Sequence, residues 1–443
     1  MLSPGSADLV GRDSVLPGLV TLLDPEAFLV ALRAAFPGAE IEQARPNYVR
    51  YKPGTSCLVL YRVDVAGQTV PVHAKAFGGD AAVKLEKARL KTRVPSLLGA
   101  GGAILEDIGA AVYAFPNDHG LRALKKLGEP GTRERLLRRL LKNQPGLSGG
   151  TLHDLQYKPE RRYVARLDTD AEPHAILKFY TRSGFQAAAA TARAGLRPMG
   201  PLRLPPLCGM SRAKFALAFE WLPGVALRDI VKEAELDTAA LSRVGAALAN
   251  LHGQKATGLA KRTRESEFDH LRRQTDMIDW LCPHLAPLAN RVTARISSQL
   301  AQLPVQHRPV HGDFNDKQIL LSEDRVAILD LDEAAAGDPA YDLGLFIAHL
   351  ERYALIGELE PSQVARLAEA LVHGYGDASG RPLPGHVELY IAFGLVQLAV
   401  EPFRTLDPDW ADKIEAMLAC ADAFLTRASP GSVTSYPTVL AGA

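Results

Sequence analysis

The side chains best suited to chemistry lie in one stretch of the sequence that contains Asp313, Gln318 and Asp330. Asp313 follows a His-Gly turn, a geometry that can hold a carboxylate clear of the backbone. Gln318 has an amide oxygen that can ligate a hard cation, and the Asp330 carboxylate can do the same. Two oxygen ligands beside a free carboxylate suit magnesium-dependent phosphoryl transfer, in which Asp313 would take the proton from a substrate hydroxyl.

Two short strands must position these side chains. The apolar runs Ile319–Leu321 and Val326–Leu329 predict the strands of one buried hairpin. Gln318 comes directly before the first strand and Asp330 directly after the second, so the hairpin would bring the two together. Asp332 follows closely, and both a role as a further metal ligand and that of a solvated carboxylate remain open.

The other polar residues of this stretch are predicted to build it. We expect His311 to support the loop through hydrogen bonds. Asn315 and Asp316 are read as turn residues, with a role as auxiliary ligands as the alternative.

The composition excludes several classes of protein. The 443 residues include 51 basic and 50 acidic ones, for a net charge of +1, which argues against nucleic-acid or polybasic membrane partners. Apolar runs fall far short of the roughly 20 residues of a membrane span, and the start of the chain lacks the pattern of a secretory signal. The cysteines are scattered singly, which predicts reduced thiols in a cytoplasmic protein: Cys57, Cys208, Cys282 and Cys420.

The N-terminal part of the chain has a mixed pattern. A helix is predicted after Asp24-Pro25, two strands over residues 48–65 and 70–77, and a helix over residues 80–90. The same order returns about one hundred residues later. Tyr157-Lys-Pro159 repeats Tyr51-Lys-Pro53, and an Ile-Leu-Lys178 strand takes the place of the strand that contains Lys75. A duplicated module of strands and a helix is one interpretation, and chance similarity is the other.

Beyond Glu220 the pattern becomes mostly helical. The predicted helices cover residues 241–252, 267–284, 289–303, 361–375 and, with breaks, 384–425. A strand–loop–strand segment at residues 309–331 interrupts them. The tail from residue 429 is rich in Ser, Pro, Thr and Gly and is expected to be flexible.

Several ordered motifs carry a family resemblance. His311-Gly-Asp313 and the later Ile-Leu-Asp330 resemble the catalytic loop and metal-binding segment of the aminoglycoside phosphotransferase and choline kinase group. The segment Gly337–Leu343 is similar to the one that follows in that group, and the resemblance implies that Asp338 and Asp342 cap a helix or brace the loop. Phe219–Gly224 resembles its hinge between lobes, and Leu248–Gly253 resembles the helix before its catalytic loop.

The resemblance implies an α+β, protein-kinase-like fold of two lobes and an ATP- and Mg²⁺-dependent kinase that phosphorylates a small-molecule hydroxyl. Catalysis would fall to Asp313 and metal binding to Gln318, Asp330 and Asp332. The nucleotide would be held by Lys178, whose place is that of the lysine on the third small-lobe strand, and by Glu220 and Leu222 at the hinge. The implied domains are an N-terminal α+β module (1–140), a small lobe (141–222), a helical large lobe (223–428) and a tail (429–443).

The sequence departs from the family pattern at two places. Gln318 stands where most members have Asn, as in a subset resembling the maltokinases, which favours a sugar, amino sugar or aminoglycoside as acceptor. The helix after Lys178 has no acidic residue to orient that lysine, and Gln186 is the nearby candidate, whereas the first copy has Lys75 followed by Glu86. The turn over the phosphates, at residues 158–162 or 52–56, lacks the G-x-G-x-x-G pattern in both copies, as is frequent in this group.

These departures leave two hypotheses open. The first is an active small-molecule kinase whose N-terminal module is a cap that packs on the small lobe, or else contributes to binding. The second is a catalytically impaired pseudokinase that binds a nucleotide or a partner. The acceptor, the oligomeric state and the choice between Lys75 and Lys178 as the nucleotide lysine are not determined by the sequence.

Overall fold

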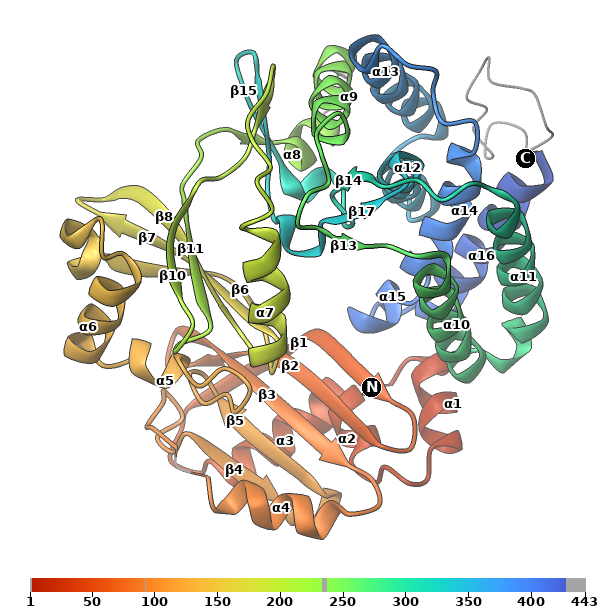
Figure 1. Cartoon of the computed structure of the whole chain (residues 1–443). Coiled ribbons are helices and arrows are strands. Elements are labelled where there is room, and N and C mark those ends of the chain that lie inside the picture. The colour runs from red at the N-terminus through yellow and green to blue at the C-terminus, as the bar shows by residue number, and fades with distance from the viewer. Residues whose placement is uncertain (1, 92, 233–236, 428–443) are drawn as a thin grey trace. The chain divides into compact units, whose positions relative to one another are not determined.

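The computed structural model describes residues 2–91, 93–232 and 237–427, and these residues form two compact units (Figure 1). The described residues of the first unit fall within Met1–Phe185, Cys208–Phe219 and Glu401–Ala411. Those of the second fall within Gln186–Leu207, Glu220–Val400 and Asp412–Ala443. The predicted division into lobes stays a prediction, and the tail predicted from residue 429 lies outside the described residues.

The first unit begins with a five-stranded sheet and the helices that flank it. Its strands follow the order β1 (Ile41–Lys52), β2 (Ser56–Val65), β3 (Gln68–Phe77), β5 (Ala110–Ala114) and β4 (Gly102–Leu105). Its helices are α1 (Pro4–Arg12), α2 (Leu19–Leu23), α3 (Pro25–Ala35) and α4 (Ala81–Arg89). The short helix α15 (Glu401–Arg404) also packs on β1.

Helix α3 shows why the sequence folds in this way. Asp24 caps the helix because its carboxylate accepts the backbone N–H of Glu26 at 3.0 Å, and Pro25 occupies the first turn. The buried Phe28 ring then stacks on Tyr61 of β2, with the ring centroids 4.0 Å apart. The cap therefore fixes where the helix starts, and the aromatic pair fixes which face meets the sheet.

A second five-stranded sheet completes the first unit. Its strands follow the order β6 (Thr151–Lys158), β7 (Arg162–Thr169), β8 (Glu172–Tyr180), β11 (Ala216–Glu220) and β10 (Leu207–Ser211). The helices that precede it are α5 (Leu124–Leu127) and α6 (Pro130–Leu140). Helix α7 (Arg182–Thr191) follows β8 and belongs to the second unit from Gln186 onward. Leucines of α5 and α6 share a buried core with this sheet. The order of strands matches that of the first sheet, with a helix after the third strand in both.

The second unit is mainly helical. Its helices are α8 (Leu227–Val231), α9 (Thr238–His252), α10 (Arg264–Leu281), α11 (Ala286–Gln302), α12 (Pro339–Leu355), α13 (Pro361–Ser379), α14 (Val387–Leu398) and, apart from its first two residues, α16 (Trp410–Arg427). One small sheet has the order β12 (Val225–Ala226), β15 (Ile319–Ser322), β16 (Arg325–Ile328) and β9 (Leu202–Arg203). Another has the order β13 (Ala260–Lys261), β17 (Ala335–Gly337) and β14 (Arg308–Val310).

The predicted α+β class is confirmed, as are the helices expected over 241–252, 267–284, 289–303 and 361–375. Helix α12 was not among the predicted helices. It is buried on nearly all sides from Pro339 to Leu350, so its sequence has no polar face to give a helical period. Within the described parts of the chain, every helix is too short or too polar to cross a bilayer.

Candidate active site

The hairpin β15–β16 carries the proposed metal ligands. Ile319 pairs with Ile328 in the antiparallel register, and the backbone N–H of Leu329 donates to the Gln318 carbonyl at 2.8 Å. Gln318 and Asp330 therefore lie at the same open end of the hairpin, as the strand pattern predicted. Asp330 has a left-handed backbone, with φ of +59°, so the chain turns sharply where the second strand ends.

The His311 ring supports the loop of the His-Gly-Asp motif. The ring is fully buried, its Nδ1 accepts the N–H of Asp313 at 3.2 Å, and its Nε2 lies 2.7 Å from the Leu329 carbonyl. A ring nitrogen that accepts carries no proton, and a carbonyl can only accept, so the network assigns the proton to Nε2. The structural role predicted for His311 is confirmed, because one ring joins Asp313 to the strand end before Asp330.

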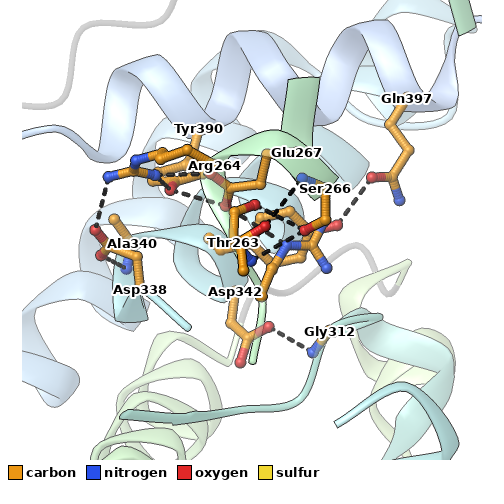
Figure 2. A network of polar contacts seen from close by, with 12 residues as sticks. Thr263, Arg264, Ser266, Glu267, Gly312, Asp338, Ala340, Asp342, Tyr390 and Gln397 are labelled. Carbon is orange, nitrogen blue, oxygen red and sulfur yellow. Dashed lines mark hydrogen bonds and ion pairs between the residues drawn. The ribbon is translucent and has the colours of Figure 1, made fainter. Parts of the chain in front are cut away.

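Asp342 braces the same loop from α12. Its carboxylate accepts the N–H group of Gly312 at 2.9 Å (Figure 2). It also accepts the N–H of His311 at 2.6 Å, and His252 Nε2 lies 3.0 Å away. Burial by itself would raise the pKa of Asp342, but the hydrogen bond and charge of His252 outweigh it, so that pKa lies below its usual range. The predicted brace is therefore present as a buried carboxylate.

Gly312 allows the loop to approach the next segment closely. Its φ is +82°, and a Cβ there would lie 2.3 Å from the Glu333 carbonyl. An L-residue would be strained by both the backbone and the contact. The glycine of the His-Gly-Asp motif is thus required by the fold of the loop.

Asn315 and Asp316 form the turn that follows Asp313. Asn315 Nδ2 donates to the Asp313 carbonyl at 2.9 Å, and its Oδ1 accepts the N–H of Lys317 at 3.1 Å. Asp316 is buried and accepts the Tyr353 hydroxyl at 2.8 Å. The turn reading of both residues is confirmed.

A polar network connects α10 and α14 to the segment that begins α12 (Figure 2). Arg264 donates to Glu267 at 2.7 Å and to the Tyr390 hydroxyl at 2.6 Å, and it lies 4.0 Å from the Asp338 carboxylate. Asp338 caps α12 by accepting the N–H of Ala340 at 3.0 Å, as predicted. These contacts fix the helix that carries Asp342.

Sequence reasoning missed the residues that support this site from a distance. Tyr353 binds Asp316, and the Tyr375 hydroxyl lies 3.1 Å from His252 Nδ1. Arg262 stacks on the Tyr341 ring, with its guanidinium carbon 3.6 Å from the centroid. No local motif marks these residues, since each meets its partner only through the packing of distant segments.

The predicted nucleotide residues are divided between the units. Lys178 lies in β8 of the first unit, is only 7% exposed, and has its Nζ 5.4 Å from the Phe219 ring. Glu220 and Leu222 lie in the second unit, where the N–H of Glu220 donates to the Pro206 carbonyl at 2.9 Å. The predicted candidate Gln186 is exposed on α7. These assignments stay predictions.

The first copy does not contain the lysine–glutamate pair that its sequence suggested. Glu86 is exposed and pairs with Arg89 at 3.5 Å. Lys75 instead donates to both carboxylate oxygens of Glu160, at 3.0 and 2.7 Å. The spacing along the chain could not reveal this, because the partner of Lys75 lies 85 residues away.

The donor set fits magnesium only in part. Across residues 2–91, 93–232 and 237–427 no group of three or more His, Cys, Asp or Glu side chains is arranged to hold a metal ion. Gln318 and Asp330 nevertheless supply two oxygen ligands at one end of the hairpin. That number suits Mg²⁺, which takes one or two protein ligands together with substrate phosphates and water.

Comparisons with known proteins give the chain its family. The model of the phosphotransferase enzyme family matches residues 146–384, a little over half of the 443 residues. A choline/ethanolamine kinase family protein from Mesorhizobium loti is 17% identical, with a TM-score of 0.45 over 68% of this chain and 96% of that one. A choline kinase from Cryptosporidium parvum is 8% identical, with a TM-score of 0.49 over 67% and 96%. A macrolide 2'-phosphotransferase from Brachybacterium faecium is 19% identical, with a TM-score of 0.41 over 65% and 98%. The chain therefore belongs to the phosphotransferase enzyme family and is a small-molecule kinase, as its motifs predicted.

Proposed function

We propose that this protein transfers the γ-phosphoryl group of ATP to a hydroxyl of a small molecule in a Mg²⁺-dependent reaction. The observation that carries the proposal is the rigid support of Asp313. Its loop is held by His311 on one side and by the buried Asp342 on the other. Such support keeps the carboxylate in a fixed place, and positioning is the main source of catalysis in phosphoryl transfer.

In the proposed reaction Asp313 orients the acceptor hydroxyl and takes its proton. The hydroxyl oxygen forms a bond to the γ-phosphorus while the bond to the bridging oxygen breaks, and ADP leaves. Gln318 and Asp330, with Asp332 as a further candidate, would hold Mg²⁺, which supplies neutralisation of the phosphate charge when bound. Lys178 would contact the phosphates, and Glu220 and Leu222 would contact the nucleotide at the hinge.

For the acceptor we propose a sugar, an amino sugar or an aminoglycoside. Family membership supports a small-molecule hydroxyl, and the glutamine at position 318 supports the sugar-like class. We place the reaction in the cytoplasm, in line with the single, scattered cysteines.

The experiment is an ATP-consumption screen over sugars, amino sugars, aminoglycosides and amino alcohols, followed by kinetics of Asp313→Ala on the best acceptor. Loss of the base should lower kcat roughly a hundredfold or more. Asp324→Asn is the matched control, because Asp324 is an exposed carboxylate in the turn of the same hairpin. An Asp313→Ala enzyme with nearly normal kcat would contradict the assignment of the base.

One observation favours a second candidate, a nucleotide-binding pseudokinase. Helix α7 has no acidic residue, and Gln186, its nearest substitute, is exposed. Calorimetric titration with ATP, with and without Mg²⁺, distinguishes the two. An affinity for ATP that does not depend on Mg²⁺, together with no ATP consumption for any acceptor, would favour the pseudokinase.

A further inference from the structure

The first turn of each five-stranded sheet is held by an aspartate from an earlier segment. In the first sheet, Asp13 accepts the hydroxyl of Tyr51 at 2.5 Å and the N–H of Gly54 at 2.9 Å. Tyr51 is the penultimate residue of β1, and Gly54 lies in the turn between β1 and β2. Asp13 is buried and precedes Tyr51 by 38 residues.

The second sheet repeats this arrangement with different residues. Asp118 accepts the hydroxyl of Tyr157 at 2.9 Å and the N–H of Glu160 at 2.7 Å. It too is buried, and it precedes Tyr157 by 39 residues. Asp118 follows β5, so the anchor of the second turn comes from the N-terminal module.

The two turns differ at one position. Gly54 has φ of +60° and Glu160 has φ of +57°, so a glutamate takes the left-handed position that a glycine takes in the first copy. This conformation is unfavourable for a residue with a Cβ. It persists where the surroundings impose it, which directs attention to the contacts of the Glu160 side chain.

Those contacts are ion pairs with the N-terminal module. Lys75 Nζ donates to both carboxylate oxygens of Glu160, and Arg50 forms a very short ion pair with the same carboxylate. Arg50 also donates to the Pro159 carbonyl at 3.2 Å. Burial opposes the ionisation of Glu160, but Lys75 and Arg50 outweigh it, so the pKa of Glu160 lies below its usual range.

Further groups of the N-terminal module contact the turn and the tyrosine before it. Tyr157 gives its only proton to Asp118, so the 3.1 Å contact with His73 Nδ1 requires that nitrogen to carry a proton. Gly120 lies so close that a Cβ there would be 2.8 Å from the Cα of Glu160. The N-terminal module therefore contacts the backbone of the turn, the Tyr157 hydroxyl and the Glu160 carboxylate.

We propose that the N-terminal module is the anchor of the phosphate-covering turn, with Glu160 as a positioning residue bound by Lys75 and Arg50. The inference rests on the proposed function, because the turn between the first two small-lobe strands covers the nucleotide phosphates in protein kinases. That turn lacks glycines in this chain, and the module supplies its shape. The carboxylate of Glu160 binds Lys75, so the lysine of the first copy serves as its counter-ion.

The test compares the full-length wild type with Glu160→Gln, Lys75→Met and Lys75→Arg. Affinity for a fluorescent methylanthraniloyl ATP with Mg²⁺ and steady-state KM for ATP are measured together with hydrogen exchange of residues 157–163. Release of the turn should raise Kd and KM about tenfold in Glu160→Gln and Lys75→Met, as expected for loss of a charged hydrogen bond. It should leave kcat nearly unchanged, since binding alone is weakened.

Two comparisons separate positioning from a general structural effect. Lys75→Arg keeps the charge and should restore most of the affinity. Asp168→Asn is the matched control, because Asp168 pairs with Arg166 on the same hairpin but lies at the end opposite the turn. It should change neither KM nor exchange at residues 157–163.

The outcomes decide between this inference and the proposed function. Absence of nucleotide binding by the wild type would reject the proposed function. Normal binding by the wild type with unchanged Kd, KM and exchange in Glu160→Gln and Lys75→Met would reject the anchor alone. Faster exchange with an unchanged KM would show that the module holds the turn without serving the nucleotide, which also overturns the inference. If Glu160→Gln does not fold, Lys75→Met against Lys75→Arg gives the answer.

Discussion

The two sheets of the first unit have the same order of strands but use the same lysine position differently. Lys75 of β3 binds a carboxylate of the other sheet, Glu160. Lys178 of β8 is nearly buried beside the Phe219 ring. In each copy an aspartate holds the tyrosine and the turn at the end of the first strand.

The comparison separates the features that the two sheets share from those that differ between them. The strand order recurs in both sheets, and so does the turn held by an aspartate. The side chain in the left-handed position differs, and with it the partner of the lysine. The same strand order therefore supports an ion pair with Glu160 in the first copy and a lysine beside an aromatic ring in the second.

The largest effect should come from exchanging the lysine of the second sheet. Lys178→Met should lower kcat/KM for ATP roughly a hundredfold, the scale for loss of one preorganised charge-stabilising group. Steady-state kinetics with varied ATP measure it, and Lys75→Met, with its smaller effect on KM, is the comparison. Equal losses in the two variants would show that the copies do not differ in function.

The next effect concerns the stability of the first module. Lys75→Met should lower the free energy of unfolding by about 1–2 kcal/mol, because Glu160 loses charged hydrogen bonds while Arg50 remains. Urea denaturation measures the change. Lys87→Met is the control, since Lys87 is exposed on α4 of the same module. If Lys87→Met lowered the free energy of unfolding by the same amount, the ion pair with Glu160 would not be the cause of the loss.

The ion pair should also depend on pH. The pKa of Glu160 is lowered in the folded state, so its contribution to stability is present above the unfolded value of about 4.3 and is lost as the pH falls through the folded pKa. The difference in unfolding free energy between wild type and Glu160→Gln should therefore shrink as the pH falls from about 6 to about 3.

Denaturation at several pH values tests this expectation. The groups that interact with Glu160 are the cations Lys75, Arg50 and Lys91, together with His73, Asp118, Tyr113 and Tyr157. Burial lowers the pKa of His73, and because the ring is common to both proteins its titration largely cancels in the difference. If the difference in unfolding free energy between wild type and Glu160→Gln grew as the pH fell, the assigned charge of Glu160 would be wrong.

The smallest effect is expected for Glu86, which the sequence suggested as the partner of Lys75. Its side chain is exposed and pairs with Arg89. Glu86→Ala should change stability by no more than about 0.5 kcal/mol, as is usual for surface sites, and should leave KM for ATP unchanged. A clear loss of ATP affinity would restore the lysine–glutamate pair as a functional element of the first copy.

Much of the catalytic segment was predictable because its residues are close in the sequence. Gln318 and Asp330 are joined by one hairpin, so alternation and spacing were enough to place them together. The roles of His311 and Asp338 were also predictable from their positions beside a loop and a helix start. Helix α12 was not, because burial on nearly all sides removes the periodic pattern.

The sequence by itself determined the family, the α+β class and the local chemistry, since motifs and turns depend on neighbouring residues. It also suggested a repeated module, through Tyr51-Lys-Pro53 and Tyr157-Lys-Pro159, and the structure shows the same order of strands in both sheets. Only the tertiary structure decided the partner of Lys75, because the contact with Glu160 joins positions 85 residues apart. No spacing rule spans that distance; the pair forms because the packing of the first unit brings a half-buried cation and a carboxylate together.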